Sequence, residues 1–153
     1  MEQQVAKLLI KRKLTIATAE SCTGGLVAHS LTNIPGSSAY FICGIVAYAN
    51  KAKIKLCGVK PATLKKYGAV SQETALELAK NIRRIGQAHI GLGITGIAGP
   101  GGGSSLKPVG TVFIAVTIGP RSLFKKFVFK GNRLRIKILS KDAALKLLLQ
   151  CLA

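Results

Sequence analysis

The sequence predicts an α/β fold in which a central mixed sheet lies between two layers of helices. Segments with apolar residues at helical spacing interleave along the chain with short, β-rich segments. Hydrophobic residues make up 48% of the 153 residues, which is enough to bury a sizeable core. No repeat, linker or low-complexity segment divides the sequence, so one domain is expected over residues 1–153.

The first half of the chain alternates between helical and extended patterns. Val5, Leu8 and Leu9 recur at the spacing of one helix face. A later helix is expected to stop before Pro35, and Pro61 suits the first position of another. The expected helices cover residues 3–12, 25–32, 51–56 (a short helix or turn) and 61–67, and the expected strands cover residues 14–19 and 40–49.

The second half contains the clearest helix of the sequence. Ser71 is a typical N-cap, Glu73 lies in the first turn, and Arg83 and Arg84 lie in the last turn, as the helix dipole favours. Leucines that recur every three or four residues predict a long helix at the end of the chain. The expected helices cover residues 72–85 and 133–152, and the expected strands cover residues 89–95, 109–118 and 123–129.

The charge composition excludes several classes of chemistry. The chain has 23 Lys plus Arg against 5 Asp plus Glu, which gives a formal net charge of +18. Five carboxylates leave little for chemistry that needs paired acids, such as glycoside hydrolysis, or for a magnesium or calcium site. An enzyme with this composition is expected to work with hydroxyls, amines and backbone groups.

The histidines and cysteines predict neither a metal site nor a disulfide. The 2 histidines have no metal-binding spacing, and the 4 cysteines form no C-x-x-C pair, so reduced and packed thiols are expected. No apolar run reaches the roughly 20 residues that span a bilayer. No secretory signal precedes the first helix, so a cytoplasmic protein without a membrane anchor is expected.

Two loops follow predicted strands and are candidates for ligand binding. Residues 20–25, Glu-Ser-Cys-Thr-Gly-Gly, precede a helix, and open α/β sheets bind ligands at such an edge. The alternative is a turn with ordinary capping residues, although the scarce Glu20 favours a site. The glycine-rich segment from Gly96 to Gly103 can bring backbone amides near an anion, but a flexible surface turn is an equal alternative. Cys22 is expected to be an inert thiol because no motif places a histidine beside it.

A Ser-Lys arrangement is the nucleophilic chemistry that this composition allows. Gly36-Ser37-Ser38 lies upstream of Tyr48-Ala49-Asn50-Lys51-Ala52-Lys53. A lysine serves as base if burial or neighbouring positive charge lowers its pKa from about 10.4. The alternative for any lysine here is a place on a solvated basic face.

Short motifs, in order along the chain, resemble the CinA C-terminal domain family. Its members include nicotinamide-nucleotide amidases, also called nicotinamide mononucleotide deamidases. At 153 residues the chain resembles the stand-alone form of the family. The matching motifs are Thr18 to Gly25, Gly36-Ser37-Ser38, Tyr48-x-Asn50-x-Ala52-Lys53, Gly68-Ala69-Val70-Ser71, Thr95 to Pro100, Lys107 to Thr111 and Gly131-Asn132-Arg133.

The resemblance implies hydrolysis of nicotinamide mononucleotide to nicotinate mononucleotide and ammonia, without a metal or cofactor, by a homo-oligomer. It implies that Ser38 is the nucleophile, that Lys53 is its base, and that Tyr48 holds or relays a proton beside Lys53. If Ser38 is not the nucleophile, Ser21 is the next candidate. The positions implied to bind the substrate are Ser21, Thr95, Gly96, Gly99 and Arg133.

Two features depart from the family pattern. Asn132 stands where many relatives have Asp, which bears on how Arg133 is held, and the net charge of +18 is high for the family. A basic nucleic-acid-binding module is therefore the alternative function. Aromatic residues make up only 5%, there is no Trp, and no nucleic-acid-binding motif appears, so only weak non-specific binding is expected.

Overall fold

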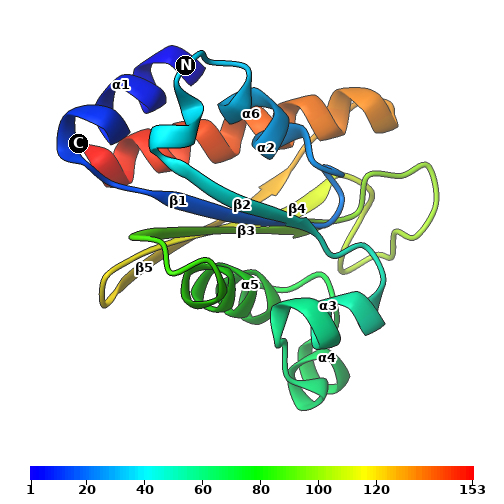
Figure 1. Cartoon of the computed structure of the whole chain (residues 1–153). Coiled ribbons are helices and arrows are strands. Elements are labelled where there is room, and N and C mark those ends of the chain that lie inside the picture. Colours follow the sequence, from blue (N-terminus) through cyan, green and yellow to red (C-terminus); the bar gives the residue numbers. More distant parts are fainter.

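The computed structural model describes all 153 residues and contains one five-stranded sheet (Figure 1). The strand order is β2-β1-β3-β4-β5, in which β2, β1 and β3 are parallel while β4 and β5 run antiparallel to their neighbours. The predicted mixed sheet is thus confirmed. The strands are β1 (Ile16–Glu20), β2 (Phe41–Val46), β3 (Ile90–Gly96), β4 (Thr111–Ile118) and β5 (Arg121–Val128).

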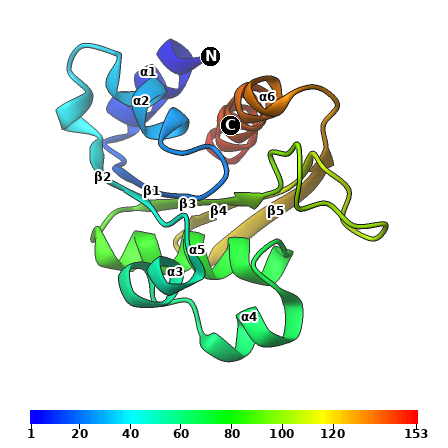
Figure 2. The same cartoon turned by 90° about the vertical axis from the view of Figure 1, so that its right-hand side faces the viewer.

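Helices cover both faces of the sheet, as the three-layer prediction requires. Figures 1 and 2 show α1, α2 and α6 on one face and α3, α4 and α5 on the other. Their bounds are α1 (Glu2–Arg12), α2 (Leu26–Thr32), α3 (Asn50–Cys57), α4 (Pro61–Tyr67), α5 (Gln72–Ile85) and α6 (Arg133–Leu152).

Two boundaries differ from the prediction near β2. A short 3₁₀ helix, η1 (Ser37–Ala39), precedes the strand and was not predicted. The strand itself ends at Val46 rather than at residue 49. The carbonyls of Ala47 and Tyr48 turn away from the ladder and accept hydrogen bonds from a side chain of α3. The sheet therefore ends where the candidate site begins.

The central strands are buried on both faces. All five residues of β1 and the first six of β3 are buried. The larger apolar cluster lies between the sheet and the layer of α1, α2 and α6. On the other face, α5 packs closely because β3 carries glycines there: a Cβ on Gly91 would lie 2.0 Å from the Ala79 carbonyl oxygen, and one on Gly93 2.4 Å from that of Ala75.

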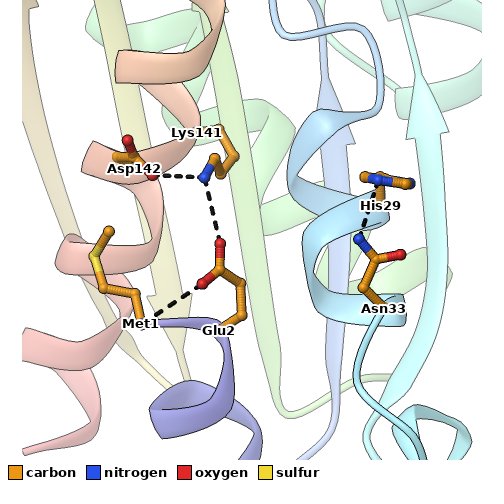
Figure 3. Close-up of polar contacts among 6 residues, drawn as sticks. All are labelled: Met1, Glu2, His29, Asn33, Lys141 and Asp142. Carbon is orange, nitrogen blue, oxygen red and sulfur yellow. Dashed lines mark hydrogen bonds and ion pairs between the residues drawn. The ribbon is translucent and has the colours of Figure 1, made fainter.

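Ion pairs join the beginning of the chain to the last helix (Figure 3). Lys141 of α6 lies 2.6 Å from Asp142 and 3.3 Å from Glu2. These pairs are partly exposed, so each is expected to contribute less than about 1 kcal/mol. No helix of the structure, α6 included, combines the length and the apolar character needed to cross a membrane.

Candidate active site at the carboxyl edge of the sheet

The centre of the site is a buried lysine. Lys53 lies in the first half of α3, and its side chain is only 2% exposed. Its Nζ donates to the hydroxyl of Ser21 at 2.9 Å and to the carbonyls of Ala47 and Tyr48 at 2.9 and 2.8 Å. No carboxylate pairs with it. Burial lowers the pKa of Lys53 from its ordinary value of 10.5.

The three partners of Lys53 differ in what they can do when the amine is neutral. Two are carbonyls, which only accept hydrogen bonds, whereas the hydroxyl of Ser21 both donates and accepts. A neutral amine can keep two N–H bonds to the carbonyls while its lone pair faces Ser21. The geometry thus orients Lys53 as a base toward one hydroxyl.

Ser21 reaches Lys53 because two parallel strands end side by side. Glu20, the last residue of β1, is in register with Val46, the last residue of β2. Ser21 is the next residue after Glu20, and its backbone N–H donates to the Ile94 carbonyl of β3. Ser21 is 7% exposed. The hydroxyl is therefore held at the carboxyl edge of the sheet, as the sequence predicts for the 20–25 loop.

Glu20 explains how that loop is held. Its carboxylate is 1% exposed and accepts the backbone N–H groups of Gly25, Val27 and Ala28 at 2.8 to 3.1 Å. These amides belong to the start of α2, and their partial positive charge stabilises the Glu20 carboxylate. Glu20 thus occupies amides that the start of a helix would otherwise offer to a ligand.

Backbone donors remain free directly after Ser21. The N–H groups of Cys22 and Thr23 have no hydrogen-bond acceptor within the chain. The Cys22 thiol is buried, and burial raises its pKa to about 12, so it stays protonated at neutral pH. It is a packed, free thiol, as predicted, whereas the hydroxyl of Ser21 is the side-chain group of this loop that contacts Lys53.

Ser38 lies at the opposite edge of the sheet. It belongs to η1, before the amino end of β2, while Lys53 bonds to carbonyls beyond the carboxyl end. The six residues of β2, which extend over roughly 20 Å at ~3.3 Å per residue, lie between Ser38 and these carbonyls. Ser38 is exposed and makes no side-chain hydrogen bond. The structure thus corrects the predicted pair: Ser21, and not Ser38, lies beside Lys53.

The hydroxyl of Tyr48 contacts Arg133 rather than Lys53. The Tyr48 backbone carbonyl accepts from Lys53, but its hydroxyl accepts from the Arg133 guanidinium at 2.5 Å. The same guanidinium donates to the Gly99 carbonyl at 2.7 Å. Asn132 accepts the N–H of Arg135 and so caps α6, which begins at Arg133. The predicted proton relay through the Tyr48 hydroxyl is not formed.

The remaining predicted residues lie at the end of β3 and in the loop that follows it. Thr95 is 1% exposed and donates to the Ala69 carbonyl at 2.6 Å, so its hydroxyl is already engaged. A Cβ on Gly96 would lie 3.0 Å from the Cys22 sulfur, which places the end of β3 against the Ser21 loop. Gly99 contributes its carbonyl to Arg133.

One charged residue of the site was missed from the sequence. Lys137 lies one turn after Arg133 on α6, and its Nζ is 3.3 Å from the position that a Cβ on Gly24 would take. The spacing of four residues within a predicted helix was the available signal. No three metal-binding side chains gather here or elsewhere in the structure.

The chain is similar to known proteins over nearly all of its length. The profile of the CinA C-terminal domain matches residues 1–152. A CinA-like protein of Chloroherpeton thalassium is 51% identical over 156 residues, which cover 99% of this chain and 37% of that protein. The chain spans about a third of the length of the curated relatives it matches.

Two solved structures show the same fold. The competence/damage inducible protein CihA from Agrobacterium tumefaciens has a TM-score of 0.92 and 39% identity, covering 97% of this chain and 94% of that one. A competence-damaged protein (CinA) superfamily protein from Enterobacter cloacae has a TM-score of 0.95 and 34% identity, covering 99% and 90%.

Proposed function

Because the chain belongs to the CinA C-terminal domain family, we propose that it is an amidohydrolase that converts nicotinamide mononucleotide and water to nicotinate mononucleotide and ammonia. The motif resemblance implies this reaction, which recycles pyridine nucleotides toward NAD in the cytoplasm. The buried hydrogen bond of 2.9 Å between Lys53 Nζ and Ser21 Oγ is the observation that carries the proposal.

In the first half-reaction, Ser21 Oγ forms a bond to the carboxamide carbon while its proton passes to neutral Lys53. Lys53 then returns that proton to the amide nitrogen, the C–N bond breaks, and ammonia leaves. The carbonyls of Ala47 and Tyr48 stabilise the transient ammonium of Lys53 through the bonds they already accept. The product of this step is an acyl ester of Ser21.

In the second half-reaction, water gives one proton to Lys53 and attacks the ester, and Ser21 recovers that proton from Lys53 as the C–O bond breaks. The carboxylic acid product then loses its remaining proton to water and leaves as the carboxylate. In both tetrahedral intermediates the negative oxygen needs donors near Ser21. The N–H groups of Cys22 and Thr23 are unpaired and follow the nucleophile directly, so we assign them this role. Since Ser21 and Lys53 are almost buried, we expect only a small group such as the carboxamide to reach the Ser21 hydroxyl.

An acyl-trapping experiment tests the assignment. Wild-type protein incubated with nicotinamide mononucleotide and quenched in acid should yield an ester on the peptide that contains Ser21, alongside ammonia release. The Ser21→Ala variant should give neither signal, and Ser38→Ala should give both. An ester on Ser38, or full ammonia release by Ser21→Ala, would overturn the choice of nucleophile.

A second candidate function is weak and non-specific binding to nucleic acid. It is supported by the observation that most carboxylates of the chain already have hydrogen-bond or ion-pair partners within it. Glu2 and Asp142 pair with Lys141, Glu20 is buried against backbone amides, and Glu77 accepts from Lys60 and Thr63. Little negative charge remains to offset the basic surface. Filter binding to duplex DNA should show affinity that falls steeply with salt.

The homo-oligomer implied by the resemblance stays a prediction, which size-exclusion chromatography with light scattering tests.

A further inference from the structure

The cations around Ser21 and Lys53 are not equivalent. Lys53 is buried and, as the proposed base, must be neutral in the reactive state. Arg133 donates to the Gly99 carbonyl and to the Tyr48 hydroxyl, so its guanidinium joins the loop after β3 to the segment between β2 and α3. Arg133 is therefore a positioning residue that holds the two walls of the site together.

Lys137 is the cation that remains free. It is half-buried, it makes no hydrogen bond or ion pair, and its Nζ lies 3.3 Å from the position that a Cβ on Gly24, three residues after Ser21, would take. Figure 2 shows α6 beside α2 on the same face of the sheet, which is the arrangement that brings Lys137 to this loop. A half-buried ammonium without an acceptor loses solvation and gains nothing in return until an anion binds.

The start of α2, which is another potential anion receptor at this edge, is already occupied. The backbone amides at the start of α2 point to the carboxylate of Glu20, and that carboxylate accepts three of them. Glu20 thus excludes an anion from the start of α2, and it forms no ion pair with Lys137.

We propose that Lys137 binds the anionic group of the substrate and sets the preference of the Ser21–Lys53 site for amides that carry a phosphate or carboxylate. This inference rests on the proposed amidase function, and it places the anion at Lys137 because the guanidinium of Arg133 is engaged with Gly99 and Tyr48. With the carboxamide at Ser21 and the anion at Lys137, a substrate is held at two points, one on each side of the 20–25 loop. A neutral amide of the same shape is held at only one point, the carboxamide at Ser21.

The test compares Lys137→Met with Lys146→Met. Both substitutions remove one positive charge from α6, but Lys146 is exposed and lies away from Ser21, among residues of β5 and the end of α6. Ammonia release is measured on nicotinamide mononucleotide, which carries a phosphate, and on nicotinamide riboside, which does not. Thermal unfolding of each variant reports whether the fold is retained.

For Lys137→Met we expect kcat/KM on the mononucleotide to fall about 10- to 100-fold, mainly through KM, as loss of a charge-assisted contact predicts. Activity on the riboside should change less than about 2-fold, and Lys137→Arg should keep most of the preference for the phosphate. Lys146→Met should resemble wild type on both substrates. An equal loss on both substrates, or no loss on either, would overturn the role of Lys137.

A binding measurement separates this inference from the proposed function. Titration calorimetry with inorganic phosphate should show binding to wild type and Lys146→Met that is lost in Lys137→Met. If wild type releases no ammonia from either substrate but phosphate binding depends on Lys137, the amidase proposal fails and the anion site stands. If ammonia is released while KM and phosphate binding are independent of Lys137, the anion site fails and the amidase proposal stands.

Discussion

Two serines at opposite edges of the same pair of strands show how position decides reactivity. Ser21 follows β1 at the carboxyl edge, is almost buried, and accepts a hydrogen bond from Lys53. Ser38 precedes β2 at the amino edge, is exposed, and has no side-chain partner. A hydroxyl in water is a weak nucleophile, whereas one held against a buried amine has a base with a lowered pKa. In the proposed mechanism the carboxyl edge supplies the reactive groups, and the amino edge supplies only a connection between α2 and β2.

The sharpest way to break this contrast is to remove each hydroxyl in turn. Ser21→Ala should lower kcat on nicotinamide mononucleotide by about 10³-fold or more, because the nucleophile is lost. Ser38→Ala should keep kcat within about 2-fold of wild type, because Ser38 contacts no other side chain. Ammonia release by the two purified variants measures the difference. Equal losses in both would contradict the separation of the two edges.

The protonation of Lys53 gives the next largest effect. Burial lowers its pKa below 10.5, and the protonated form cannot accept the Ser21 proton. The rate constant kcat/KM should therefore be low at acid pH and rise as pH increases through that lowered pKa, reaching its plateau before 10.5. A profile that still rises at the pKa of an exposed lysine would show that burial does not prepare the base.

Lys53→Arg is the control for charge. Arginine stays protonated throughout this pH range, so the variant should lose about 10²- to 10⁴-fold in kcat at every pH and show no rise. Circular dichroism and thermal unfolding should show that the fold survives. An active Lys53→Arg enzyme would assign Lys53 a binding role instead.

The sequence was sufficient to predict the layers of this fold and to place the 20–25 loop directly after a strand and before a helix. The reasons are local: the apolar spacing of residues 72–85, the cap at Ser71 and the carboxylate of Glu20 each act on residues nearby in the sequence. The choice between Ser21 and Ser38 was not local. It depends on parallel pairing of β1 with β2, which brings only their carboxyl ends to α3. The position of Lys137 near the 20–25 loop likewise depends on the packing of α6 beside α2, which local sequence patterns do not reveal.

Glu20 tests whether the carboxyl edge is built as a rigid support for Ser21. Glu20→Gln keeps the size of the side chain but replaces one accepting oxygen with an NH₂ group that faces a backbone N–H. We expect the free energy of unfolding to fall by about 2 kcal/mol, measured by urea denaturation. Glu73→Gln is the matched control, since Glu73 accepts only from the neighbouring Gln72, and it should change stability by less than about 0.5 kcal/mol. Equal effects in the two variants would mean that the buried carboxylate does not support the loop.

The smallest expected effects distinguish the two edges through a pair of tyrosine hydroxyls. At the amino edge, the buried Tyr40 hydroxyl donates to the Leu31 carbonyl at 2.6 Å. Tyr40→Phe leaves that carbonyl unpaired, so the free energy of unfolding should fall by about 1 kcal/mol while kcat/KM stays unchanged.

At the carboxyl edge, the Tyr48 hydroxyl is exposed and accepts from Arg133. Tyr48→Phe should cost less than about 0.5 kcal/mol of stability, because water replaces the lost bond. It should still lower kcat/KM several-fold, since the Arg133 guanidinium then bonds only to the Gly99 carbonyl and no longer to the segment between β2 and α3. Urea denaturation and ammonia release on the same two variants give both readouts. If Tyr40→Phe lowers activity as much as Tyr48→Phe, the division of roles between the two edges is wrong.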